Sequence, residues 1–387
     1  MVYTNTKDLK LAFEVLTNAF SKRTQLHVLK NVKVETKGNK IYFTTTDLDN
    51  HASVEMEGHT EVSSYSILVN FAEISNAVKK CTSETVEMFF DEENHVFILQ
   101  GNITYRFLAN YDVDDFPDVN VNIDPVGEIS FDNKRLFLKY IKDMTTFMIN
   151  NQFTRKSLHG ILMAQTDDHV DLVATDVHRL SLLQTKQIEI PCEDVVLPFP
   201  VVNLINKIGK KEDFKLIVGS ETTEKTRWIN FIINESKYNI SYITRGVRNE
   251  FPNHRLIIPS GYQETGNLEN SISFTGSSKE FSGILGQFIN FYKKAVTIVN
   301  MTNDREGMKV FTISGDCENQ MGSVVAWQTD DPDLGFVAGV NAKYLKEALD
   351  TLPNSPLTIK RDETPLIFLR EKTNDHIHFH VIMPAKV

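Results

Sequence analysis

The chain has 387 residues, 41% hydrophobic and 24% charged, which is the balance of an ordinary folded protein and excludes a disordered one. Its length exceeds what one hydrophobic core usually serves, so two or three domains are expected. No long apolar run and no signal-like start occur, which predicts a cytoplasmic protein, and three isolated cysteines argue against a disulfide framework or a thiolate zinc site.

Six segments have the periodicity of amphipathic helices. Three long ones share apolar residues at positions i, i+3, i+4, i+7, i+10 and i+11, and a shorter one follows each of them. The long patterns begin at Leu9, Phe137 and Phe281, and the short ones at Phe71, Val201 and Leu345. The chain therefore predicts two helices in each third.

A strand that ends in a polar turn occurs twice. Thr46-Asp47 follows an alternating run, and Thr175-Asp176 follows another one 129 residues later, which is one third of the chain. A weaker third copy reads Ser314-Gly315-Asp316. Such a period predicts one module repeated three times. We place the modules at 1–126, 127–262 and 263–387, with Phe-Pro pairs at 116–117 and 251–252 closing the first two.

Alternating β-branched and aromatic residues dominate between the helices, as in Trp228-Ile229-Asn230-Phe231-Ile232. Two helices are too few to cover both faces of a sheet with this many strands. Each module is therefore predicted to be an α+β unit, in which an antiparallel sheet is backed by two helices.

Charge is unevenly distributed along the chain. Lys and Arg exceed Asp and Glu by 11 over the six helical segments. Because the whole chain has a net charge of −10, the residues outside these segments have a net charge of −21. The segments counted are 7–23, 70–80, 133–147, 200–211, 279–294 and 341–352. Lysine pairs such as Lys210-Lys211 suit helix C-termini, where cations offset the macrodipole. The recurrence favours a basic helical surface that contacts phosphates without reading sequence.

The sequence contains none of four common motifs: the phosphate-binding G-x-x-x-x-G-K-[ST] and G-x-G-x-x-G, the metalloprotease H-E-x-x-H, and the hydrolase G-x-S-x-G. His376, His378 and His380 alternate, so in a strand they share one face. That face is either a metal centre of a DNA-acting enzyme or, equally well on this pattern, a solvated outer sheet face. His178-Arg179 has no nucleophile or carboxylate pair nearby in sequence, which favours a structural or peptide-contact role.

The run Val173-Ala174-Thr175-Asp176-Val177-His178-Arg179-Leu180, preceded by Leu158-His159-Gly160, resembles the second domain of the bacterial DNA polymerase III β subunit, the sliding clamp family. The Phe-Pro pairs and the terminal Val381-Ile382-Met383-Pro384 fit the same family, so the resemblance covers the whole chain. It implies a homodimeric ring of six clamp-type domains around duplex DNA, with helices inside and no catalysis or cofactor. The family usually has glycine where this chain has Val177.

The resemblance further implies partners and a site for them. The expected partners are double-stranded DNA, a replicative polymerase, a clamp loader and other proteins with a clamp-binding peptide, on DNA of the nucleoid and away from membranes. The peptide would enter an apolar cleft between the second and third domains. By motif, its walls are Leu158, Thr175, His178, Arg179, Leu180, Pro252, Ile257, Tyr344, Val381, Met383 and Pro384. The alternative is that these residues form ordinary interdomain core.

Residues that face DNA or the second subunit follow from the same resemblance and from the charge count. The DNA-facing candidates are Arg23, Lys79, Lys142, Gln152, Arg155, Lys207 and Lys293. The subunit interface is expected to pair Leu108 with Ile298 and Val299. Two other classes stay open at this point: the metal-dependent enzyme above and a non-enclosing interaction scaffold.

Overall fold

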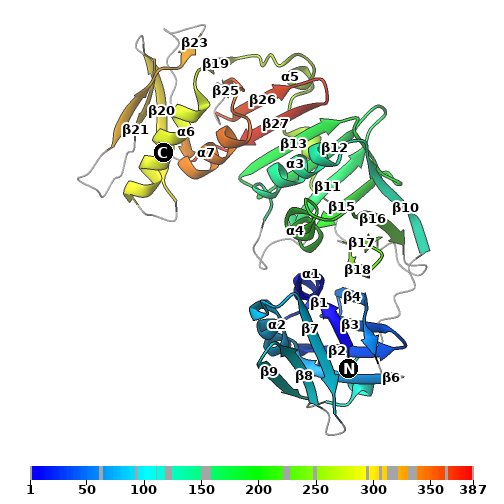
Figure 1. Ribbon diagram of the computed structural model, residues 1–387. Coiled ribbons are helices and arrows are strands. Elements are labelled where there is room, and N and C mark those ends of the chain that lie inside the picture. The colour runs from blue at the N-terminus through cyan, green and yellow to red at the C-terminus, as the bar shows by residue number, and fades with distance from the viewer. Residues whose placement is uncertain are drawn as a thin grey trace. The chain divides into compact units, whose positions relative to one another are not determined.

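The computed structural model shows a chain of antiparallel sheets and helices (Figure 1). It describes residues 2–60, 64–91, 95–109, 111–117, 124–149, 158–220, 227–246, 251–292, 296–304, 307–311, 321–329, 338–361 and 365–385. Within these ranges no helix is long and apolar enough to cross a membrane.

One order of elements is repeated three times along the described chain. The first copy contains β1 (Val2–Asn5), α1 (Thr6–Leu16), β2 (Asn31–Lys37), β3 (Lys40–Thr46), β4 (Asn50–Glu57), β5 (His59–Thr60), β6 (Ser64–Asn70), α2 (Phe71–Lys80), β7 (Thr85–Phe90), β8 (His95–Gln100) and β9 (Ile103–Leu108).

The second and third copies follow the same order. The second contains β10 (Asp124–Phe131), α3 (Lys134–Thr145), β11 (Gly160–Gln165), β12 (Val170–Thr175), β13 (Arg179–Thr185), β14 (Ile188–Glu189), β15 (Asp194–Pro198), α4 (Phe199–Ile208), β16 (Lys215–Ser220), β17 (Arg227–Asn234) and β18 (Tyr238–Arg245). The third contains β19 (Ser271–Thr275), α6 (Ser278–Tyr292), β20 (Ile298–Asp304), β21 (Gly307–Phe311), β22 (Gly322–Val325), β23 (Gln328–Thr329), β24 (Ala338–Asn341), α7 (Ala342–Thr351), β25 (Leu357–Lys360), β26 (Ile367–Lys372) and β27 (His376–Ile382).

This order confirms the α+β class and the triplication. All six predicted helices are present, and a short helix between the second and third copies, α5 (Ser260–Thr265), was not predicted. Four helices begin after an asparagine whose side chain accepts a backbone N–H of the first turn, namely Asn5, Asn70, Asn133 and Asn341. Capping and an apolar stripe together explain why these segments form helices.

The chain divides into two compact units. Unit 1 contains residues 1–130 and 190–248, and unit 2 contains residues 131–189 and 249–387. In unit 1 one antiparallel sheet includes the strands β10-β16-β17-β18-β4-β3-β2-β6, so β4 of the first copy pairs with β18 of the second. In unit 2 another includes β11-β12-β13-β27-β26-β25-β19-β23, where β13 pairs with β27 of the third copy. We call these the two joined sheets.

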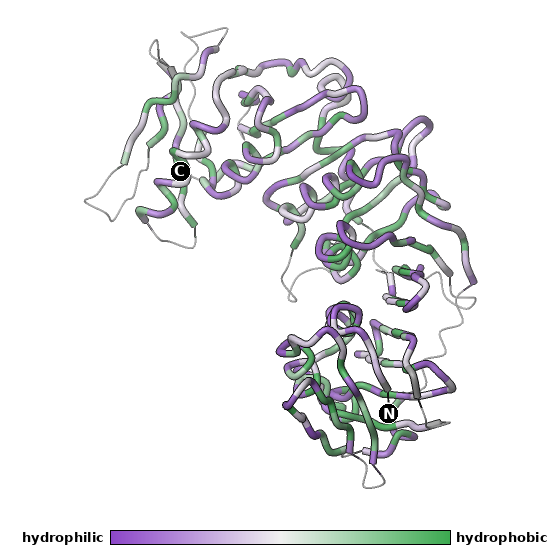
Figure 2. Tube along the Cα trace, viewed as in Figure 1, coloured by the Kyte–Doolittle hydropathy of each residue, from purple (hydrophilic) through white to green (hydrophobic). Residues whose placement is uncertain are grey.

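Each unit has a second sheet with a free edge. Unit 1 has the order β5-β1-β7-β8-β9, and unit 2 has the order β22-β21-β20-β24. Among the described strands, β9 and β22 therefore each have a partner on one side only. Apolar residues follow the strands of both units, shown in green in Figure 2, and rings such as Phe13 and Phe43, with centroids 5.4 Å apart, pack in the cores.

The polar turn is built identically in its first two copies. Thr46 donates its hydroxyl to the Asn50 carbonyl at 2.9 Å, and Thr175 donates to the Arg179 carbonyl at 2.7 Å. Asp47 and Asp176 each accept two later backbone N–H groups through Oδ1. The residue directly after each aspartate has a positive φ, which is +79° at Leu48 and +76° at Val177. The third copy, Ser314-Gly315-Asp316, lies outside the described residues.

Candidate functional site

Three of the predicted cleft residues form a row across the joined sheet of unit 2. Thr175 on β12 pairs with Leu180 on β13, and Leu180 pairs with Val381 on β27. Residues directly opposite each other in a sheet share a face, so the three side chains lie on the same side. We call it the linker face, because the segment 251–259 makes contact with it through Asp171, another residue of that face.

Arg179 lies on the opposite face, which α3 and α7 approach. Its Nε donates to Asp176 Oδ2 at 2.9 Å, Nη1 to Glu347 Oε2 at 2.5 Å, and Nη2 to the Thr146 carbonyl at 2.7 Å. The guanidinium carbon lies 4.8 Å from the ring centroid of Phe147 and 4.3 Å from that of Tyr344.

Arg179 is only 6% exposed, and its guanidinium contacts lie within the chain. The family resemblance implied that it lines the peptide cleft. The structure instead makes it a buried contact between the second and third copies, because cation–π stacking and charge-assisted hydrogen bonds both favour that position.

His178, Tyr344 and Met383 surround the exposed side of the turn. The rings of His178 and Tyr344 stack with centroids 6.2 Å apart. The Met383 N–H donates to the His178 carbonyl at 2.9 Å, while the Met383 side chain is 44% exposed. The next residue is Pro384, and the following N–H, of Ala385, donates to the Gly339 carbonyl. Burial raises the pKa of Tyr344 above its usual value.

The remaining cleft candidates differ in exposure. Leu158 is buried before β11, whereas Pro252 is exposed and Ile257 is 37% exposed in the linker. Leu256, also in the linker, is the most exposed large apolar side chain of the described residues. Exposed apolar side chains thus lie close to the linker face in sequence. Val177 is in the turn between β12 and β13, Ile257 is in the linker, and Met383 directly follows β27.

The three histidines of β27 are buried, which corrects both sequence hypotheses for them. Tyr140 Oη lies 3.3 Å from His376 Nδ1, Ser181 Oγ lies 2.9 Å from His378 Nε2, and the His380 ring stacks on Phe147 with centroids 4.3 Å apart. Burial lowers the pKa of His380 to about 3. The face is neither solvated nor a metal centre: it is core under α3, and no metal-binding group of three side chains occurs among the described residues.

The basic candidates that the structure describes are on the surface. Arg23 follows α1, Lys79 lies in the last turn of α2, Lys142 lies on α3 and Lys207 on α4, and all four are exposed. Gln152, Arg155 and Lys293 lie outside the described residues. Lys139 on α3 pairs with Asp143 at 2.9 Å, so not every helical cation is available to an anion.

The subunit-interface candidates do not lie on equivalent strands. Leu108 is 53% exposed on the free edge strand β9. Ile298 and Val299 are on β20, which pairs with β21 and β24, and Val299 is fully buried. In the second sheet of unit 2, β22 and β24 are the edge strands among the described residues, and Val324 on β22 is 49% exposed. Leu108 thus lies on an edge strand while Ile298 and Val299 lie on an inner one, and their pairing across a subunit interface stays a prediction.

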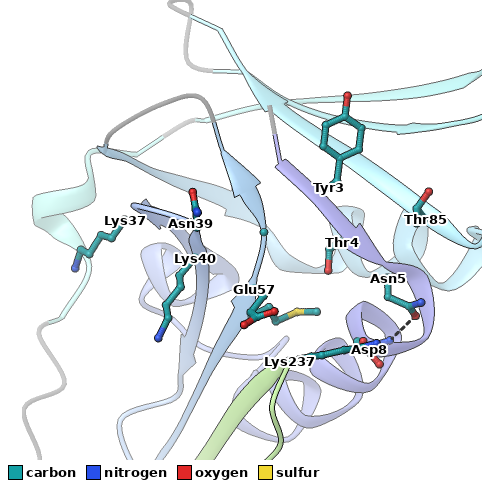
Figure 3. A pocket seen from close by; sticks show the side chains of 12 residues that line it. Tyr3, Thr4, Asn5, Asp8, Lys37, Asn39, Lys40, Glu57, Thr85 and Lys237 are labelled. Atoms are coloured by element: carbon teal, nitrogen blue, oxygen red, sulfur yellow. Dashed lines mark hydrogen bonds between the residues drawn. The ribbon is translucent and has the colours of Figure 1, made fainter.

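Two hollows in unit 1 include none of the predicted site residues. One, of about 780 Å³, lies between β1 and the β2–β3 hairpin, and Figure 3 shows Lys37, Lys40 and Lys237 around it with Asp8 and Glu57. The other, of about 460 Å³, lies beneath the linker residues Phe116 and Pro117. Both signs of charge line the first hollow, from three lysines and two carboxylates.

Comparisons with known proteins agree on one family. Residues 4–121 match the model of the DNA polymerase III beta subunit N-terminal domain, and residues 133–253 match that of its central domain. The beta sliding clamp of Staphylococcus epidermidis is 21% identical over 383 residues, covering 95% of this chain and 94% of the relative.

Two solved structures have the same fold over the whole chain. The DNA polymerase III beta subunit of Thermotoga maritima superposes with a TM-score of 0.82 at 18% identity, covering 100% of this chain and 99% of the other. A beta clamp of Helicobacter pylori bound to a DNA ligase peptide superposes with a TM-score of 0.76 at 18% identity, covering 100% of both chains.

Proposed function

The chain belongs to the DNA polymerase III beta subunit family of sliding clamps, and from this premise we propose that two copies close head to tail into a ring around duplex DNA. A sliding clamp is a processivity factor: it catalyses nothing and tethers the polymerase to its template by enclosing it. The predicted modules, 1–126, 127–262 and 263–387, would then supply the ring with six similar parts. We place it on DNA in the nucleoid.

The free edges carry the proposal of ring closure. The fourth strand of one copy pairs with the ninth strand of the next, as β4 with β18 and β13 with β27. The remaining fourth and ninth strands are β22 and β9, which lack that partner among the described strands. Pairing β22 of one chain with β9 of another would repeat the same antiparallel junction, and it would cover edges that otherwise invite aggregation.

DNA contact is assigned to the basic helices. Exposed cations on α2, α3 and α4 can offset phosphate charge without contacts to base edges, and a ring that must slide gains nothing from reading sequence. The acidic remainder of the chain would then face outward.

Partner peptides are assigned to the linker face beside the second copy of the turn. The Helicobacter clamp binds a DNA ligase peptide. In this chain an apolar row of Leu180 and Val381, with exposed Ile257 and Met383 on adjoining segments, suits apolar side chains of such a peptide. Met383 can adapt to different partners because its side chain is unbranched.

The ring is tested by topology. Protein loaded by a clamp loader onto nicked circular DNA should stay bound in high salt and should leave when a restriction enzyme cuts the circle. Equal retention before and after cutting would rule out enclosure, as would release from the intact circle. Added divalent metal should not produce cleavage of the DNA.

A further inference from the structure

We propose that Asp171 is a positioning residue that anchors the linker 251–259 against the linker face and so fixes one wall of the peptide cleft. The proposal rests on the proposed function, because the linker can be a wall of the cleft only if partner peptides bind there. Asp171 lies on β12, four residues before Thr175 and on the same face. It lies outside the set of cleft residues that the sequence predicts.

The carboxylate is buried and contacted from three directions. Its side chain is 3% exposed. His254 Nε2 of the linker lies 3.4 Å from Oδ2, while His169 Nε2 and Gln184 Nε2 lie 3.1 Å and 3.2 Å from Oδ1. The guanidinium of Arg255, also in the linker, lies 3.7 Å from Oδ2. A buried carboxylate needs such partners. Moving the linker away would leave the Asp171 carboxylate without two of them, and this unfavourable free energy keeps the linker in place.

The linker alternates between anchored and exposed residues. His254 and Ile258 are 6% and 1% exposed, whereas Leu256 and Ile257 between them are 84% and 37% exposed. The anchor therefore turns two apolar side chains outward. Exposure of these apolar side chains to water is unfavourable in free energy, and a bound partner that covers them would remove this penalty.

At the position that corresponds to Asp171, the first copy has no carboxylate. The residue 129 positions before Asp171 is Tyr42, which lies under the Lys37 ammonium at 5.7 Å. Beneath its linker is the hollow of about 460 Å³, whose floor includes Thr44 and Ser53. Val173 and Leu182, the residues 129 positions later, are buried. The carboxylate anchor and the closed apolar floor thus occur together, in the copy to which the cleft is assigned.

His254→Leu tests the anchor from the linker side, where it leaves the sheet intact. We expect the labelled DNA ligase peptide bound by the Helicobacter clamp to bind this variant about tenfold more weakly than wild type. Backbone hydrogen exchange should accelerate within 251–259 and not in β12 or β13. His254→Gln, which keeps a donor, should recover much of the affinity, and Asp171→Asn should weaken binding in the same direction.

Asp132→Asn is the matched control. Asp132 is an exposed aspartate of the same unit, directly after β10. It should bind the peptide as wild type does. Unchanged affinity in both His254→Leu and Asp171→Asn, with wild type binding, would overturn the anchor while leaving the proposed function intact. A wild-type protein that does not bind the peptide would overturn both. Solution mass should show the wild-type assembly for every variant.

Discussion

Val177 holds a backbone conformation that its side chain disfavours. Its φ of +76° lies in the left-handed region, where a β-branched residue is strained and glycine is not. The turn keeps its shape because Thr175 and Asp176 accept or donate four hydrogen bonds around it. The sequence departs from the family glycine here, yet the hydrogen bonds preserve the turn.

Val177→Gly should stabilise the protein by about 1 kcal/mol, because it removes this strain while losing little burial from a side chain that is 64% exposed. Urea unfolding at neutral pH measures the change. Val177→Ala keeps a Cβ at positive φ and should give no comparable gain. If alanine stabilised as much as glycine, exposure of the valine rather than its φ would be responsible.

His380 makes stability depend on pH. Burial, aided by the nearby Arg179 charge, lowers its pKa from 6.5 to about 3. Between these values the unfolded chain binds a proton that the folded chain does not, so the free energy of unfolding should fall as pH falls from 6.5 toward 3. The slope for this one group is at most about 1.4 kcal/mol per pH unit.

Unfolding titrations at pH 7.5, 6 and 5 test this. His380→Leu should reduce the fall in stability between pH 6 and pH 5, whatever its effect at pH 7.5. His27→Gln, at an exposed position, should leave the fall unchanged. An equal pH dependence in wild type and His380→Leu would mean that other groups control acid unfolding.

Among the elements, α3 and α4 offer the clearest test of DNA contact. Lys142→Glu with Lys207→Glu should shorten retention on circular DNA and reduce the slope of log affinity against log salt, since each lost phosphate contact removes about 0.9 from that slope. Lys186→Glu, on an exposed turn, changes charge elsewhere and is the control. A slope that does not change would show that these lysines point away from DNA.

The C-terminal segment is predicted to serve partners rather than assembly. Deleting Met383 to Val387 removes the main-chain bonds to His178 and Gly339 but leaves every strand of the joined sheet. Stimulation of a polymerase should be lost while the dimer persists, which a primer-extension assay and sedimentation would measure. Dissociation into monomers would contradict this division of roles.

Local patterns predicted the elements well and their environments less well. The helices follow from a 3.6-residue apolar period, and the two turns from Thr-Asp spacing, because both depend on neighbours in sequence. Alternation at His376, His378 and His380 predicts one shared face but not what covers it. Helix α5 has six residues, too few for a period to emerge.

The candidate site shows the same limit. Sequence could name Arg179 but not its stacking between Phe147 and Tyr344, which brings together residues about 30 and 165 positions away in the chain. It also missed Asp171, whose partner His254 is 83 residues distant. Sequence also could not show that β20 is an inner strand and β22 an edge strand, because an edge is a property of the whole sheet.

At the scale of the molecule, the free edges predict how the assembly can be broken. Leu108→Glu combined with Val324→Glu should yield monomers in sedimentation, because charges on β9 and β22 oppose strand pairing in a buried junction. Leu26→Glu, at a residue that is 54% exposed, is matched in chemistry and should stay dimeric. A dimer that survives the double substitution would place the contact elsewhere.

Strand pairing between copies also decides which pieces of this chain can be produced alone. A fragment cut at residue 126 would leave β4 without β18, and one beginning at residue 263 would leave β27 without β13. Each would present an open row of amide and carbonyl groups and would tend to precipitate on expression. Dissecting the polypeptide therefore calls for co-expressed complementary fragments rather than isolated thirds.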